Sequence, residues 1–275
     1  MHTGVLAYST STRVRVCVCV CVRVCVITSE FDMLVFRLLL RGFETVTYVT
    51  SGCLRHEDFC GHEGILSAGD VQWMTAGRGI VHSEMPHTRP AGSVEKNGGF
   101  QLWINLKSAD KMCEPEYQEL ESADIPTASA SGVHVKVVAG SSLGVASALK
   151  TRTPALFLDI TLDPRGSCTQ ALTPGWNGVL YVFEGRIAVE DSVVEKHHAA
   201  VLDADGDHVT IINPDKTARA RCLLIAGKPI GEPVVQYGPF VMNTMEEIEK
   251  TFQDLRQGKN GFERAPRWKS KAGIH

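Results

Sequence analysis

The sequence lacks any apolar run of the roughly 18 residues that a membrane-spanning helix requires. The most apolar stretch near the N-terminus is interrupted by Arg13, Arg15 and Arg23. Those arginines also break the continuous apolar core that a secretory signal would need. We therefore expect neither a membrane span nor secretion.

The sequence also lacks a large excess of charge of either sign. Its 28 basic and 31 acidic residues give a formal net charge of −3, so direct contact with nucleic acid is not expected. A disulfide framework is absent as well, because the nine cysteines are odd in number and four of them share one short repeat. Free thiols are typical of a reducing compartment, and we expect the protein in the nucleus and cytoplasm.

Helical periodicity is scarce before about position 240, whereas short apolar strands separated by Gly, Asp and Pro recur. Residues 155–162 alternate with period two, which is typical of a strand with one buried face. Many short strands of this kind predict an all-β protein. Two stretches of similar rhythm indicate two jelly-roll-like β-barrel domains, at 41–126 and 132–235.

The segment 236–275 is predicted to hold a helix and a basic tail. Thr244 followed by Glu247 three residues later is a capping box, and Gly258 is suited to end the helix. One helical face is apolar, which predicts a helix packed on a sheet; its residues are Met245, Ile248, Phe252 and Leu255.

The stretch RVRVCVCVCVRVCV, residues 13–26, carries Val at every even position and only Arg or Cys between. As protein, it could be a strand or a Cys-x-Cys metal ladder, although thiolates on one strand face do not by themselves make a tetrahedral site. A GTGTGT repeat in DNA would also encode the alternation of Val and Cys, and a single T-to-C change turns the Cys codon TGT into the Arg codon CGT. We therefore also entertain the hypothesis that residues 1–40 are an aberrant or disordered segment.

The sharpest candidate site is His82 with Glu84. Residues two apart on a strand point to the same face, and an imidazole beside a carboxylate is half of an iron, manganese or zinc site. His56 is a further candidate ligand. The alternative is an exposed His/Glu pair without metal.

Several motifs in order resemble the pirin family of bicupin proteins over residues 41–271: RGFETVTY, HEDFCGH, GDVQWMTAGRGIVHSEMP, FQLWINL, EPEYQEL, YGPFVMNT and KNGFERAPRWKSK. The resemblance implies two stacked cupin barrels in a monomer, with one Fe(II)/Fe(III) ion in the first. It also implies two functions: a quercetin-type flavonol 2,3-dioxygenase, and a redox-sensing transcriptional co-regulator that binds a transcription factor.

The resemblance implies an iron ion that is held by three His and one Glu. His82 and Glu84 match the second pair, but the first pair would fall at positions occupied by Leu38 and Leu40. Leucine cannot coordinate a metal, so we expect weak iron binding. Glu84 would also act as a base, and Arg41 and Glu44 would tune the site; for these two, a strand-end salt bridge is the alternative.

Three hypotheses therefore stand for the chain: a flavonol dioxygenase, a protein-binding co-regulator, and a non-functional or N-terminally mis-spliced gene model. In the third, a different first exon would supply the missing histidine pair.

Overall fold

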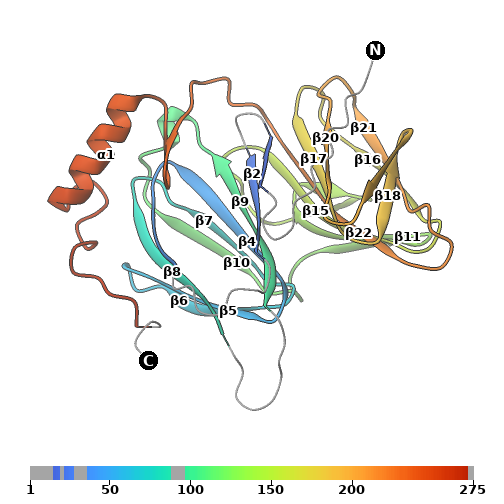
Figure 1. Ribbon diagram of the computed structural model, residues 1–275, viewed down its shortest axis with the longest axis horizontal. Coiled ribbons are helices and arrows are strands. Elements are labelled where there is room, and N and C mark those ends of the chain that lie inside the picture. Colours follow the sequence, from blue (N-terminus) through green and yellow to red (C-terminus); the bar gives the residue numbers. More distant parts are fainter. Residues whose placement is uncertain (1–14, 19–21, 28–35, 88–96, 272–275) are drawn as a thin grey trace. The chain divides into compact units, whose positions relative to one another are not determined.

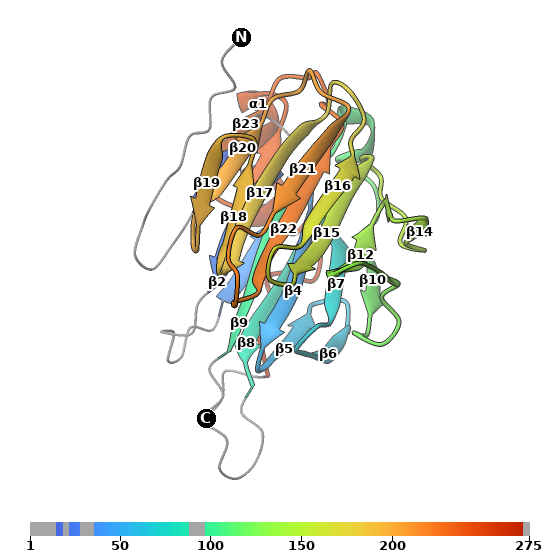
Figure 2. The same ribbon diagram turned by 90° about the vertical axis from the view of Figure 1, so that its right-hand side faces the viewer.

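The computed structural model describes residues 15–18, 22–27, 36–87 and 97–271 (Figures 1 and 2). Strands dominate this part of the chain. Its helical elements are α1 (Met245–Gln257) and the short 3₁₀ helix η1 (Ser108–Asp110). The all-β prediction is confirmed. No helix among the described residues is long and apolar enough to span a membrane.

The chain forms two compact units. The N-terminal unit combines residues 23–122 with residues from 230 onward, and the C-terminal unit contains residues 123–229. The helix and tail that the sequence sets apart at 236–275 thus belong to the N-terminal unit. The chain returns to this unit after completing the other.

The N-terminal unit holds two main sheets. One has the order β2-β9-β4-β7-β10 and the other β3-β8-β5-β6. The strands are β2 (Val22–Ile27), β3 (Phe36–Leu40), β4 (Phe43–Ser51), β5 (Cys53–Asp58), β6 (Glu63–Ser67), β7 (Val71–Thr75), β8 (Ile80–Pro86), β9 (Gly98–Asn105) and β10 (Glu116–Leu120), with the hairpin β23 (Val235–Tyr237) and β24 (Phe240–Met242).

The valine-rich repeat contributes strands where it is described. β1 (Arg15–Val18) and most of β2 fall within residues 13–26, in keeping with the strand interpretation of their alternation. β3 also lies inside the segment 1–40 that we predicted to be aberrant or disordered, and it pairs with β8 along its whole length. The remainder of that segment is outside the described residues, and it includes Cys19 and Cys21, two of the four cysteines on which a metal ladder would depend.

The C-terminal unit is built from two further sheets, in the orders β11-β12-β15-β22-β17-β20 and β16-β21-β18-β19, and the small hairpin β13-β14. The alternating leucines and isoleucine of 156–162 all lie in its apolar core. Its strands are β11 (Thr127–Ala130), β12 (Val133–Ala139), β13 (Ser141–Ser142), β14 (Val145–Ala146), β15 (Ala155–Leu162), β16 (Ser167–Ala171), β17 (Asn177–Glu184), β18 (Arg186–Val189), β19 (Ser192–Glu195), β20 (Ala199–Leu202), β21 (His208–Ile212) and β22 (Ala220–Gly227).

The predicted capping box of α1 is present. Glu247 N–H donates to Thr244 Oγ1 at 3.2 Å, and Thr244 N–H donates to Glu247 Oε2 at 3.1 Å. Gly258 ends the helix in the left-handed conformation with φ 61°, which favours glycine because no Cβ is strained. Ile248 places the helix on the apolar core of the N-terminal unit, beside β24.

Candidate functional site

Two strands of the N-terminal unit bring the candidate ligands together. In the register of β5 and β8, His56 lies opposite Glu84 and Asp58 lies opposite His82. Directly paired residues point to the same face of a sheet, so these four side chains share one face. All four are at least 95% buried, which places His82 and Glu84 in the interior rather than on an exposed strand face.

A row of polar side chains on the second sheet contacts this group. Glu119, Gln72, Thr47 and Gln101 follow one register line across β10, β7, β4 and β9; we call them the facing row. Thr47 Oγ1 donates to Glu84 Oε1 at 3.0 Å, and Gln101 Nε2 donates to Glu84 Oε2 at 2.8 Å. The Glu84 carboxylate is therefore fixed from the opposite sheet through both of its oxygens.

His56 is held by the same row. Its Nδ1 lies 3.0 Å from Gln72 Nε2 and accepts a hydrogen bond when the ring is neutral. Its Nε2 lies 3.3 Å from Glu119 Oε1, an electrostatic contact without hydrogen-bond geometry. Burial lowers the pKa of His56, against the opposing effects of the carboxylates of Glu119, Glu84 and Asp58. A neutral imidazole is therefore favoured at neutral pH.

His82 also favours the neutral imidazole, and one of its ring nitrogens has no hydrogen-bond partner among the described residues. Burial lowers its pKa, although the carboxylates of Glu84 and Asp58 act in the opposite direction. Its Nε2 is buried and has no hydrogen-bond partner among the described residues. A neutral imidazole with an unpaired nitrogen is the form that binds a metal ion, and an orphaned buried polar atom normally has a functional or structural reason.

The neighbouring strand supplies leucines at the positions where the resemblance implies two further ligands. Leu38 lies opposite His82 in the β3–β8 register, and Leu40 lies opposite Ile80. Leu40 is completely buried, and both leucines pack against the apolar core. Among the described residues, no group of three or more His, Cys, Asp or Glu side chains is arranged to hold a metal ion. The residues present therefore do not fit a four-ligand iron ion.

Arg41 contacts α1, the helix of the N-terminal unit. Its guanidinium donates to Asp254 Oδ2 at 2.9 Å and to Thr251 Oγ1 at 3.1 Å, and it stacks on the Phe262 ring at 4.5 Å. Burial lowers the pKa of Arg41, and Asp254 opposes that shift. Its described contacts therefore fasten α1 and the segment after it, and none joins His82 or Glu84.

Glu44 is buried on β4, where it accepts a hydrogen bond from Thr75 Oγ1 at 2.8 Å. It is three residues before Thr47, so the two point to opposite faces of the strand. Thr47 contacts Glu84, and Glu44 is therefore directed away from the candidate ligands.

The residues of the facing row were not among the site residues predicted from the sequence. Its signal is a polar residue within an apolar strand, as with Gln72 in VQWM and Gln101 in FQLW. Each is at most 7% exposed, and buried amides need partners. Identifying those partners requires the pairing of strands that are distant in the sequence.

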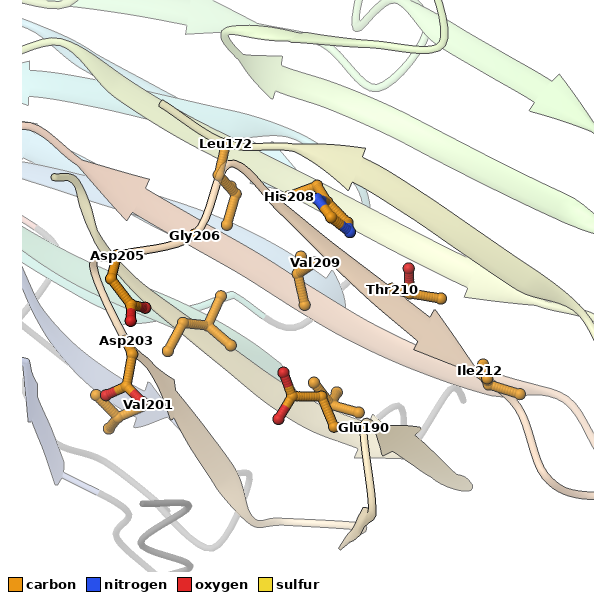
Figure 3. Close-up of a pocket in the computed structure, with 12 residues that line it drawn as sticks. Leu172, Glu190, Val201, Asp203, Asp205, Gly206, His208, Val209, Thr210 and Ile212 are labelled. Carbon is orange, nitrogen blue, oxygen red and sulfur yellow. The ribbon is translucent and has the colours of Figure 1, made fainter. Parts of the chain in front are cut away.

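The C-terminal unit has a separate pocket of about 270 Å³ (Figure 3). Val209 and Leu172 are among its apolar lining residues, and Asp203, Asp205 and Glu190 bring carboxylates to it. Residues 123–229 of this unit contain no His-x-His pattern. No three-donor metal group occurs in its described residues.

Comparison with known proteins gives consistent matches in both units. The family model "Pirin" matches residues 37–104, and "Pirin C-terminal cupin domain" matches residues 157–261. Pirin-like protein 2 of Arabidopsis thaliana is 52% identical over 236 residues, covering 84% of this chain and 72% of the relative. Human pirin is 50% identical over 238 residues, covering 85% of this chain and 80% of the relative.

Among solved structures, a quercetin 2,3-dioxygenase from Acinetobacter baumannii superposes with a TM-score of 0.77 at 32% identity. The match covers 88% of this chain and 85% of that one. The jelly-roll cupin architecture of the two units agrees with this likeness.

Proposed function

Because the chain belongs to the pirin family, we propose that its reaction class is the oxidative cleavage of a flavonol-like small molecule inside the N-terminal unit. We propose further that the reaction is weak in this chain, since Leu38 and Leu40 replace two metal ligands. The observation that carries the proposal is the buried pair of His82, with its unpaired Nε2, and Glu84, held at both oxygens. The likeness to a quercetin 2,3-dioxygenase supports the substrate class.

The residues present account for one part of such a reaction. The Glu84 carboxylate is fixed by Thr47 and Gln101 but retains further acceptor capacity, since two oxygens offer about four lone-pair positions. It is thus placed to accept the proton of an acidic substrate hydroxyl. The interior around it is buried, which strengthens its electrostatic interactions with a bound molecule.

Restoring the two missing ligands tests the proposal. In the Leu38→His/Leu40→His variant, one imidazole is added directly opposite His82 and the other lies two residues further along the same face. We expect the variant to bind one equivalent of Fe(II) in a metal titration and to consume oxygen with quercetin, whereas the parent chain retains little metal after desalting.

Leu39→His is the matched control, because residue 39 lies opposite Val81 and points to the other face of β3. It should gain neither metal nor oxygen uptake. Equal metal retention by the control and by the double variant would refute the site. Metal binding by the double variant without oxygen uptake would keep the metal centre but refute the flavonol reaction.

A second candidate is the redox-sensing co-regulator that binds a transcription factor in the nucleus. The incomplete donor set around His82 weakens the catalytic alternative, whereas binding to a protein partner needs no catalytic turnover. Its test is a pull-down of a Rel-type factor with and without Fe(II). Absence of capture in both conditions would count against this role.

The origin of the leucines is a separate question. β3 pairs with β8 over five residues, so the strand is compatible with the sheet whatever its coding history. Sequencing the 5′ end of the transcript tests the mis-splicing hypothesis. A mature message that joins the CVCVCV repeat to LLLRGFET would refute it.

A further inference from the structure

A basic segment crosses the outside of the two strands that carry the candidate ligands. We call residues 264–271 the C-terminal strap. Ser270 Oγ donates to the Glu57 carboxylate and lies 3.3 Å from Ser83 Oγ. Lys271 Nζ lies 3.6 Å from Glu63 Oε2 at the exposed end of the strap. Ala265 and Trp268 attach the earlier part of the strap to the apolar core of the unit, whereas its last residues are held by the Ser270 hydroxyl and the Lys271 ion pair.

The residues beneath Ser270 are almost completely buried. Glu57 and Ser83 are paired across β5 and β8, and they are 4% and 1% exposed. They alternate along the strands with His56 and His82, so they lie on the opposite face from the candidate ligands. The hydroxyl of Ser270 thus reaches a buried carboxylate and leaves no room for a larger group.

The residues around Ser270 have the charge pattern that basophilic protein kinases select. Arg267 is three residues before Ser270, and Arg264 is six residues before it. The Arg267 side chain is exposed, and the hydrogen bond it makes within its unit comes from its backbone. Arginines at fixed distances before an acceptor hydroxyl engage acidic groups in the substrate groove of such kinases.

We propose that Ser270 is a phosphorylation site and that its modification detaches residues 269–271 from β5 and β8. A basophilic kinase transfers the γ-phosphoryl group of ATP: the bond from that phosphorus to the bridging oxygen breaks, Ser270 Oγ forms a new bond to phosphorus, the hydroxyl proton is released, and ADP leaves. The modified side chain can no longer donate to Glu57. Its two negative charges and its size are incompatible with the buried carboxylate.

The earlier part of the strap remains attached. Ala265 is 2% exposed, and Phe262, just before the strap, is completely buried in the core of the unit. The change is therefore a local opening rather than unfolding of the domain. It exposes the outer face of the strands that carry His56, His82 and Glu84 on their inner face.

The test uses the full chain with a basophilic kinase and Mg-ATP, followed by mass spectrometry and hydrogen exchange. We expect one phosphate at Ser270 and at least about tenfold faster exchange of residues 269–271, because a charged hydrogen bond that held the closed state is lost. Arg267→Ala should reduce labelling at least about tenfold while leaving the strap closed. Ser270→Ala should abolish labelling at this position.

A pair of substitutions separates charge from size. Ser270→Asp should speed exchange of the strap more than Ser270→Asn, because the two side chains differ in charge and scarcely in volume. Absence of phosphate at Ser270 in the parent chain would overturn the proposal. Equal exchange of the phosphorylated and unphosphorylated strap would overturn it as well, whatever the fate of the oxygenase activity.

Discussion

Replacing Lys111 by methionine will change the pH dependence of the stability of the N-terminal unit. Lys111 is 1% exposed, and its ammonium donates to three neutral oxygens: Gly42 O at 2.9 Å, Val241 O at 2.9 Å and Asn105 Oδ1 at 2.6 Å. Burial lowers its pKa from 10.5 to about 8, against the more distant carboxylates of Glu232 and Glu247. Methionine has similar length but no charge to titrate.

The direction of the change in stability with pH follows from the number of protons that the folded and the unfolded chain bind. Between pH 8 and 10.5 the unfolded chain keeps the proton on Lys111 while the folded chain loses it, so the free energy of unfolding rises with pH. The lowering of the Lys111 pKa from 10.5 to about 8 corresponds to at most about 3 kcal/mol. Below pH 8 both states are protonated, and the contribution of this residue is constant.

The assay is urea unfolding followed by tryptophan fluorescence at pH 7, 8, 9 and 10.5. Trp73, Trp103 and Trp268 belong to the N-terminal unit, so the signal is dominated by the unit that contains Lys111. We expect the parent chain to gain stability relative to Lys111→Met by up to about 3 kcal/mol across this range. All other titrating groups are common to both chains and cancel in the difference.

Parallel stability curves for the two chains would refute the reasoning. That result would mean that the three oxygen acceptors compensate the burial of the ammonium completely. A difference that shrinks with rising pH would contradict the direction of the shift.

Three further predictions concern the attachment of α1 and its flanks. Arg41→Met should destabilise the N-terminal unit by about 3–5 kcal/mol in urea unfolding, because it leaves the buried Asp254 carboxylate without its cation; a loss below about 1 kcal/mol would contradict this. Gly42→Ala should prevent folding as judged by circular dichroism, because its Cβ would lie 2.1 Å from Val241 O at φ 87°; a native spectrum would be the contrary result. Thr244→Ala should cost about 1 kcal/mol through loss of the helix cap, measurable as faster hydrogen exchange in the first turn of α1, with Thr217→Ala in the C-terminal unit as control.

Local patterns predicted most of the fold. The alternation of 156–162 identified the strand and one of its buried faces, because side-chain direction on a strand depends only on position along it; the other face is buried as well, through Phe157 and Asp159. Thr244 and Glu247 identified the start of α1 because a capping box is complete within four residues. Such features need no knowledge of the rest of the chain.

The candidate site was predictable only in part, because some of its contacts join residues that are distant in the sequence. The common direction of His82 and Glu84 follows from their spacing, but the contact of Glu84 with Gln101 depends on two sheets facing each other. The role of Arg41 is a clearer case. Its ion pair with Asp254 spans 213 positions, and nothing near RGFET indicates that the partner is a helix at the other end of the chain.

The return of the chain to its first unit has a consequence for the order of synthesis. A ribosome completes residues 23–122 and then the whole of 123–229 before Phe240, Asp254 and Phe262 emerge. Until then Arg41 has no carboxylate partner and the apolar surface that receives Phe240 stays uncovered. The first unit to be started is therefore the last to be finished, and nascent chains paused within 123–229 should depend on chaperones that bind exposed apolar surface.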